Sequence, residues 1–271
     1  MQILETANMK FTILTATYNR AYILPKLYAS LCDQTFRNFE WVIVDDGSCD
    51  GTKELVASWK PFFEIRYVWQ PNRGKHTALN RGVPMAKGEL IYAIDSDDYL
   101  LPNALEILNR RWNEIPEPRR FACLTGLCRR PDGSLISGTL PSDPFDSFSY
   151  GLSLRTWKGD RTGVVRADAW REFPFPEFPG EHFIPEGVVW SRLINKYGIR
   201  YFNEPLLVMT YAPDGFTSSK RDLRWSNPRG ATLMYWIIAR STGSPPKQRF
   251  QAAINSVRFL LVAIIKALVR C

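Results

Sequence analysis

The first 112 residues of the chain alternate between two kinds of hydrophobic pattern, and this alternation constrains the fold more than any other feature. Short apolar runs are each followed by a segment whose apolar residues recur at helical spacing. Four consecutive strand-and-helix units predict a Rossmann-like α/β fold, with a mostly parallel central sheet flanked by helices. The predicted strands and helices, in chain order, are 11–15, 22–31, 39–48, 52–59, 65–69, 75–86, 90–94 and 102–112.

Two of these predicted strands end in clusters of acidic residues. Asp45 and Asp46 close the run "FEWVIVDD", and the motif "DSDD" (95–98) follows the strand at 90–94. The run at 39–48 is apolar without alternation, as expected for a strand that is covered on both faces. Ligands of such sheets bind outside the carboxyl ends of the strands. We therefore expect both clusters to lie where a ligand or a metal ion offsets their repulsion.

Beyond residue 121 the pattern is looser, with a helix predicted at 188–196 and a strand at 205–211. We expect one α/β domain over 9–212, with two halves of about 9–100 and 101–212. Residues 213–271 are predicted to form a basic helical C-terminal extension.

The net charge of +8 is concentrated in this extension. Residues 213–271 contain ten Lys/Arg and two Asp, whereas the first 212 residues contain 25 basic and 25 acidic residues. Such asymmetry favours an anionic partner. Nucleic acid is disfavoured, because the aromatic residues do not interleave with the charges and no recognition motif is present. The apolar helix at 248–269 is interrupted by Arg258 and Lys266, so it is predicted either to lie in a membrane interface or to pack on protein.

The five cysteines have no regular spacing, and the sequence has two histidines, so no zinc-site pattern exists. A reducing compartment is the simplest interpretation. Residues 1–9 contain Glu5 and no apolar core, so no cleavable signal peptide is expected. We predict a cytoplasmic protein, with peripheral contact to the inner face of a membrane through residues 213–271.

Four motifs together resemble those of family 2 glycosyltransferases with the GT-A fold. They are "TATYNR" (15–20), "VDDGSCDGT" (44–52), "NRGKHTALNRG" (72–82) and "DSDD" (95–98), and they occur in the family's order and spacing. The resemblance covers roughly residues 10–210. It implies that the domain at 9–212 is catalytic, with a nucleotide-binding half at about 9–100 and an acceptor half at about 101–212. It implies an enzyme that uses a nucleotide-diphospho-sugar as donor, as in the synthesis of polysaccharides and cell-surface glycans.

A diphosphate carries negative charge and needs a cation. Asp95 and Asp97 resemble the family's pair of acids for this purpose, and hard oxygen ligands suit Mn²⁺ or Mg²⁺. The resemblance implies that Asp97 is the direct metal ligand, and that Asp95 contacts the ribose or a metal-bound water. Asp98 is expected outside the coordination shell, and a polar turn is the alternative interpretation of the motif.

The resemblance also assigns nucleotide-binding residues. Asp46 would accept the imide N–H of uracil, and Thr15 and Tyr18 would flank the base. Arg20 would reach a phosphate. Lys75 opens a predicted helix, and a lysine at a helix N-terminus forms an anion site.

In inverting members of the family, a carboxylate before a downstream helix acts as general base. We expect Glu186 to have this role, although the family usually has Asp there. Glu181 is the alternative base, and either residue could instead cap a helix. Asp160, Arg161 and Glu181 are expected on the acceptor side, and a structural ion pair is the alternative for Asp160 and Arg161.

These residues predict a metal-dependent, inverting glycosyltransferase that moves a single sugar, most simply UDP-linked, to a saccharide or lipid-linked acceptor. The segment "RDLRW" (221–225) lacks the Gln of the signature of processive synthases, which favours a single transfer. The loop at 214–220 is predicted to close over the donor, with Lys220 or Arg221 near the leaving diphosphate. The alternatives are a sugar nucleotidyltransferase and a non-catalytic nucleotide- or glycan-binding module. Homo-oligomerisation is left open.

Overall fold

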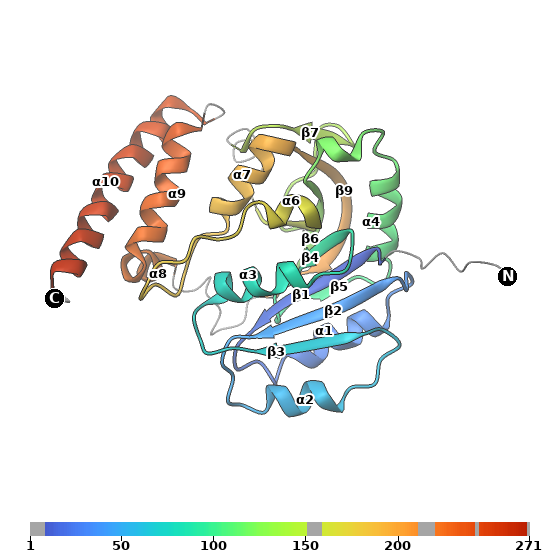
Figure 1. The fold of residues 1–271 in the computed structure, drawn as a ribbon. Helices are drawn as coiled ribbons and strands as arrows, with labels where there is room; N and C mark the ends of the chain where they lie inside the picture. Colours follow the sequence, from blue (N-terminus) through green and yellow to red (C-terminus); the bar gives the residue numbers. More distant parts are fainter. Residues whose placement is uncertain (1–8, 151–158, 211–219, 242–243, 270–271) are drawn as a thin grey trace.

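A computed structural model describes residues 9–150, 159–210, 220–241 and 244–269 (Figure 1). Its nine strands form one mixed sheet in the order β3-β2-β1-β4-β8-β6-β9-β5, and β7 pairs with β9. The strands are β1 (Phe11–Thr17), β2 (Phe39–Asp45), β3 (Ile65–Trp69), β4 (Leu90–Ala93), β5 (Tyr99–Leu100), β6 (Cys123–Arg129), β7 (Phe145–Ser147), β8 (Arg161–Arg166) and β9 (Ile199–Val208).

Helices cover both faces of the sheet, as the sequence predicted. The helices are α1 (Leu24–Cys32), α2 (Thr52–Ser58), α3 (Lys75–Met85), α4 (Ala104–Asn113), α6 (Ala167–Arg171), α7 (Gly187–Tyr197), α8 (Lys220–Ser226), α9 (Pro228–Arg240) and α10 (Pro246–Val269). A short 3₁₀ helix, η1, spans Pro118–Arg120.

Neighbouring residues of the central strands supply two separate cores. On β1, Ile13 belongs to the core that contains residues of α1 and α4, while Leu14 belongs to the core that contains residues of α3, α6 and α7. On β2, Ile43 and Val42 divide in the same way. Successive side chains of a strand point to opposite faces. A strand that is apolar without alternation is therefore buried on both sides, which confirms the expectation for β2.

The strands β1, β2, β3 and β4 are mutually parallel, and β4 pairs antiparallel with β8. In this register Thr17 lies opposite Asp45, and Leu14 lies opposite Ala93. The segments that follow β1, β2 and β4 therefore leave the sheet at the same edge, where the site is found.

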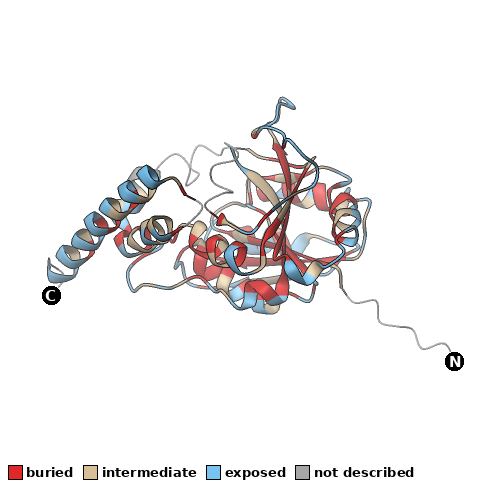
Figure 2. Cartoon of the chain, turned by 90° about the horizontal axis from the view of Figure 1, so that it is seen from above, coloured by how far each residue is buried: buried red, intermediate tan, exposed pale blue. Residues whose placement is uncertain are grey.

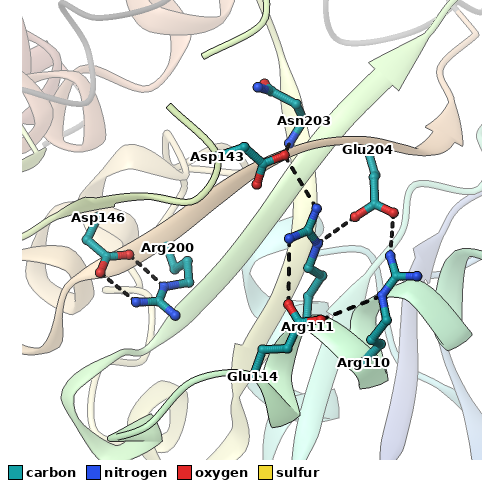
Figure 3. A network of polar contacts seen from close by, with 8 residues as sticks. All are labelled: Arg110, Arg111, Glu114, Asp143, Asp146, Arg200, Asn203 and Glu204. Carbon is teal, nitrogen blue, oxygen red and sulfur yellow. Dashed lines mark hydrogen bonds and ion pairs between the residues drawn. The ribbon is translucent and has the colours of Figure 1, made fainter. Parts of the chain in front are cut away.

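A network of ion pairs holds α4 to β9 on the side of the acceptor half (Figure 3). Arg110 and Arg111 of α4 both bind Glu204 of β9, and Arg111 also reaches Asp143. Arg200 of β9 binds Asp146 of β7 through two hydrogen bonds of 2.7 Å. None of the predicted site residues takes part in these contacts, so we assign the network a structural role.

The C-terminal helices α9 and α10 lie side by side in Figures 1 and 2. They are joined to the catalytic domain by hydrogen bonds across the predicted boundary at residue 212. Asn227 Oδ1 accepts hydrogen bonds from the backbone N–H groups of His182 and Phe183, at 2.7 and 3.1 Å. The helical extension is thus anchored to the loop that leads to Glu186.

Candidate active site

Lys75 joins the two parts of the predicted site. Its ammonium lies 2.5 Å from Oδ1 of Asp95, beyond the end of β4, and 2.7 Å from Oε1 of Glu186, just before α7. The side chains of Asp95 and Glu186 are 52% and 44% exposed, whereas that of Lys75 is 28% exposed. The structure therefore brings a predicted donor-binding acid and the predicted general base to one cation, at an open surface.

The position between two carboxylates also determines the charge of Lys75. Burial lowers the pKa of its ammonium, but the attraction and hydrogen bonds of Asp95 and Glu186 outweigh it and raise the pKa overall. Lys75 is thus a permanent cation at neutral pH. It stands at the first position of α3, where the backbone N–H groups of the helix also favour an anion.

The start of α3 is set by a close approach of two loops. Gly74 precedes Lys75 with φ 98°, and a Cβ at this position would overlap the backbone carbonyl of His182. A residue with a side chain is disfavoured at this φ and excluded by the contact. Gly74 therefore allows the loop before α3 to touch the loop that carries Glu186.

Asp46 organises the same loop. Its Oδ1 accepts hydrogen bonds from Gln70 Nε2 and from the backbone N–H of Arg73, and its Oδ2 accepts one from the N–H of Gly74, at 2.8, 3.0 and 2.7 Å. The residue is 4% exposed. A carboxylate has about four acceptor positions, so three of them are used within the protein. In this structure Asp46 places the loop before α3, and one position is left for a ligand.

Asp45 orients the loop that follows β2. Its carboxylate is buried and accepts hydrogen bonds from the N–H of Ser48 and from the hydroxyl of Tyr67, at 2.7 and 2.5 Å. Burial and the neighbouring Asp45 raise the pKa of Tyr67, which keeps its hydroxyl a donor. This arrangement fixes the turn that follows β2.

The segment after β1 is tied to the segment after β2. Asn19 has φ 52°, its N–H donates to Ser48 Oγ at 2.7 Å, and its Oδ1 accepts from the N–H of Cys49 at 2.9 Å. Tyr18 is 48% exposed beside this junction, and Arg20 donates to the hydroxyl of Tyr22 at 2.6 Å. Tyr18 is therefore available to a ligand, as its predicted role requires.

Thr15 differs from its neighbours. It is fully buried within β1, and its hydroxyl oxygen accepts a hydrogen bond of 3.0 Å from the indole N–H of Trp41. Its side chain belongs to the sheet and presents no surface to a base. The prediction that Thr15 flanks the base is corrected for its side chain, because this side chain is buried in the sheet and bonded to Trp41.

The acidic loop after β4 is braced from the end of β9. Asp98 is buried, and its Oδ1 accepts a hydrogen bond of 2.8 Å from the N–H of Thr210, while the Thr210 hydroxyl donates to the carbonyl of Asp97. Burial, together with repulsion from Asp95 and Asp97, raises the pKa of Asp98 to about 8. Asp98 is thus a buried loop residue, its place outside the coordination shell stays a prediction, and Thr210 is a positioning residue that no sequence motif indicated.

The structure corrects the prediction for Glu181. Its Oε1 and Oε2 accept hydrogen bonds from the N–H groups of Arg229 and Gly230, at 2.7 and 2.9 Å, and the residue is 9% exposed. These are free donors of the first turn of α9, which a carboxylate satisfies well. Glu181 therefore caps α9, which was the alternative weighed for it, and it is not an acceptor-side residue.

Asp160 and Arg161 do not pair with each other in the described structure. Asp160 is exposed, and Arg161 donates to the carbonyl of Gly138 at 2.6 Å and lies 5.8 Å from the ring centre of Tyr201. Arg161 is thus committed to the strand region. The loop at 214–219 and the side chains of Lys220 and Arg221 lie outside the described residues.

Tyr150 is a neighbour of Glu186 that sequence reasoning missed. Its hydroxyl lies against Gly187, the residue after Glu186, and burial raises its pKa to about 12. The charge of Glu186 contributes to the same shift. An isolated "SFSY" segment gave no signal for this, because the contact depends on how β7 and α7 meet.

The two acids of the loop after β4, Asp95 and Asp97, fit a divalent cation. Within the described residues, no group of three or more His, Cys, Asp or Glu is arranged as a complete metal site. Magnesium-type sites in nucleotide enzymes commonly use one or two carboxylates and complete their shell with phosphate oxygens and water. Asp95 is half exposed, and Asp95 and Asp97 both raise the pKa of Asp98 by repulsion. Such crowding of negative charge is what a bound cation relieves.

Comparisons with known proteins find similar sequences among glycosyltransferases. Residues 12–124 match the model of glycosyl transferase family 2. The chain is 34% identical over 108 residues to the GalNAc(5)-diNAcBac-PP-undecaprenol beta-1,3-glucosyltransferase of Campylobacter jejuni, covering 39% of this chain and 35% of that protein. It is 35% identical over 129 residues to a chondroitin synthase of Pasteurella multocida, covering 46% of this chain and 13% of the synthase. The chain thus spans well under two thirds of these relatives.

Solved structures show the fold over nearly the whole chain. S. aureus TarS 1–349 superposes with a TM-score of 0.66 at 18% identity, over 93% of this chain and 71% of that chain. The mannosyltransferase PcManGT of Pyrobaculum calidifontis, in complex with GDP-Man and Mn²⁺, gives 0.59 at 18% identity, over 97% and 76%. The predicted α/β fold of GT-A type is confirmed. Residues 12–124 are thus similar to the family 2 glycosyltransferases, in the part of the chain that carries the four motifs.

Proposed function

We propose that the chain transfers a single sugar from a UDP-linked donor to a saccharide or lipid-linked acceptor, with inversion at the anomeric carbon. The observation that carries this proposal is the Lys75 ammonium between Asp95 and Glu186. Lys75 thus contacts Asp95, an acid of the predicted donor site, and Glu186, an exposed carboxylate suited to proton transfer. The names of similar proteins support the donor class, since TarS was solved with UDP-GlcNAc and PcManGT with GDP-Man.

The donor would lie across the carboxyl ends of β1, β2 and β4. Tyr18 offers an exposed ring for the base, and Asp46 offers its remaining acceptor position to the imide N–H. Lys75 and the N-terminus of α3 would attract the diphosphate, with Arg20 at the outer side. A diphosphate would exchange with the carboxylates for Lys75, because the phosphate oxygens carry similar charge.

Asp97 and Asp95 would hold a Mn²⁺ or Mg²⁺ ion. When bound, such an ion supplies positive charge to the diphosphate and so makes UDP a better leaving group. The half-exposed carboxylate of Asp95 and the brace of Thr210 on the loop suit this role. The choice between the two metals is left to the experiment.

Glu186 would act as general base. Its carboxylate would accept the proton of the acceptor hydroxyl while that oxygen bonds to the anomeric carbon and the bond from this carbon to the diphosphate breaks. The sugar is then inverted, and UDP departs with the electron pair of the broken bond. Gly187 lets the hydroxyl of Tyr150 approach the backbone beside Glu186, since a Cβ at this position would overlap that hydroxyl.

A screen of nucleotide-sugars tests this proposal. Melting temperatures with and without Mn²⁺ identify the donor, because a ligand of the native state raises the melting temperature. Release of UDP from that donor is then measured for wild type, Asp97→Asn and Asp33→Asn. Asp33 is an exposed residue just beyond α1. Its replacement by Asn is the control, because it removes the same charge away from the site. We expect the Asp97 variant alone to lose activity. Release that is equal in all three proteins, or absent for every donor tested, would refute the proposal.

The same test separates the alternatives. A sugar nucleotidyltransferase would release pyrophosphate from a nucleoside triphosphate, and a binding module would show a thermal shift without turnover. We also propose that the reaction takes place in the cytoplasm. The support is the five cysteines without regular spacing, which suit a reducing compartment.

A further inference from the structure

One side of α10 is apolar and exposed along its whole length. The apolar face of α10, as defined here, consists of Phe250, Ile254, Val257, Leu261, Ile264, Ile265 and Leu268, which are 47–72% exposed. Their spacing of three and four residues places them on one side of a helix. Figure 2 shows exposed residues recurring along α10. A soluble helix normally turns such a stripe to the core, so this face needs a partner.

The opposite side of α10 is already occupied. Ala252, Ser256, Phe259 and Ala263 are buried there. Ser256 Oγ donates to the carbonyl of Thr232 of α9 at 3.1 Å, and the Phe259 ring stacks on Tyr235 at 5.6 Å. The protein covers one side of the helix and leaves the apolar face bare.

Three of the four cations of α10 are held against the neighbouring helices, and Lys247 at its start is exposed. Lys266 Nζ donates to the carbonyl of Trp225 at 2.7 Å, and Arg258 lies 4.7 Å from the ring centre of Trp225. Arg249 Nε donates to the carbonyl of Ala239 at 3.0 Å. These three charged groups thus border the apolar face, and the expected helix is continuous from Pro246 to Val269.

We propose that the apolar face of α10 lies in the interface of an anionic membrane, with the helix axis parallel to the bilayer. Amphipathic helices of this kind bind through their buried apolar area and through attraction to anionic lipids. Residues 223–269 contain seven Lys/Arg and no Asp or Glu. A second copy docked by this face would bring two such basic surfaces together, whereas an anionic bilayer offsets them.

An orientation across the membrane is disfavoured by the same contacts. By length and composition, α10 is the one described helix that could cross a bilayer, with a mean hydropathy of 1.9. Crossing would strip α10 from α9 and leave Lys266 and Arg258 without these partners. Lying flat keeps the contacts and buries only the bare side.

This orientation fixes the site relative to the lipid. α9 packs on α10, its first turn is capped by Glu181, and Asn227 binds the N–H groups of His182 and Phe183 in the loop that leads to Glu186. A short chain of direct contacts therefore connects the membrane-facing helix to the proposed base. The membrane contact itself does not depend on the proposed function, but it would deliver a lipid-linked acceptor.

Sedimentation of the full chain with vesicles tests the proposal. The vesicles are phosphatidylcholine alone, or phosphatidylcholine with a third of phosphatidylglycerol. The variants are Leu261→Gln/Leu268→Gln on the apolar face, and Leu135→Gln as an exposed apolar control elsewhere. We expect wild type and control to bind the anionic vesicles and the double variant to bind at least about tenfold more weakly, with unchanged circular dichroism and UDP binding.

Four outcomes would overturn the proposal. They are equal binding by the double variant, no binding by wild type, a wild-type dimer that the double variant converts to monomer without vesicle binding, and resistance of bound wild type to alkaline carbonate extraction. The dimer result would show that the apolar face binds a second copy of the chain. Resistance to carbonate extraction would show that α10 spans the membrane. UDP binding is measured separately, so failure here leaves the proposed function untouched.

Discussion

Lys75 and Glu186 form an ion pair of 2.7 Å between the first residue of α3 and the residue that precedes α7. The same ammonium binds Asp95. Three elements that are far apart in the sequence thus meet at one charge. The site is held together by electrostatic attraction in the absence of donor, and its response to substitution can be predicted from these contacts.

Replacing Glu186 by Gln removes the proposed base but keeps its size. We expect the transfer rate to fall by at least about a hundredfold, the usual contribution of a positioned general base. UDP binding should stay within about threefold of wild type, because the nucleotide contacts lie at β1, β2 and β4. Steady-state transfer and calorimetric UDP titration measure the two quantities, and a variant with near wild-type kcat would show that another group takes the proton.

Replacing Lys75 by Met leaves Asp95 and Glu186 without their shared cation. We expect UDP to bind at least about tenfold more weakly, because the cation that attracts the diphosphate is lost. Mn²⁺ alone should raise the melting temperature of this variant more than that of wild type, since the ion offsets the acids that Lys75 no longer neutralises. Lys60→Met, on an exposed residue, is the control. Unchanged UDP affinity in Lys75→Met would remove Lys75 from the donor site.

Gly74→Ala tests the loop contact beside the site. The new Cβ would overlap the carbonyl of His182 at a positive φ, and we expect a loss of about 2 kcal/mol or more in the free energy of unfolding. Gly51→Ala is a matched control, with φ 82° and no atom within 4 Å of the added Cβ. It should lose only about 1 kcal/mol, from backbone strain. Urea unfolding measures both, and equal losses would show that the contact with His182 is unimportant.

Glu181→Gln separates a helix cap from a catalytic acid. We expect the melting temperature to fall by a few degrees, because loss of a cap costs about 0.5–2 kcal/mol. The kcat of the folded enzyme should be unchanged. Glu117→Gln, an exposed carboxylate with one ion pair at 3.6 Å, should leave the melting temperature unchanged. If kcat of the Glu181 variant fell as far as that of Glu186→Gln, Glu181 would have to be reconsidered as a base.

The fold of the first half could be predicted because its determinants are local. The strand at β2 is apolar on both faces, and the acids at its end and after β4 mark the edge of a parallel sheet. The second half could not be traced in this way. Its strands pair out of order, as with β8 between β4 and β6, and no sequence pattern encodes such pairings.

The features of the site that the sequence did not predict also depend on contacts between distant segments. Lys75, Asp95 and Glu186 were predicted one by one, but their mutual ion pairs depend on how α3 and α7 approach. Glu181 was ambiguous from sequence, because a carboxylate before a helix can be a cap or a base, and only the N–H groups of α9 decide between them. Thr15 closes the predicted strand 11–15 and also opens the motif 15–20, and the sequence alone did not show that its side chain is buried in the sheet.

Calorimetric titration of UDP into wild type and Asp97→Asn, each with and without Mn²⁺, tests most directly whether the acids at these strand ends bind a metal-diphosphate. We expect wild type to bind UDP at least about tenfold more tightly with Mn²⁺ than without it, and the Asp97 variant to show no such gain. Equal UDP affinity in all four titrations, or no UDP binding in any, would contradict the assignment of this site.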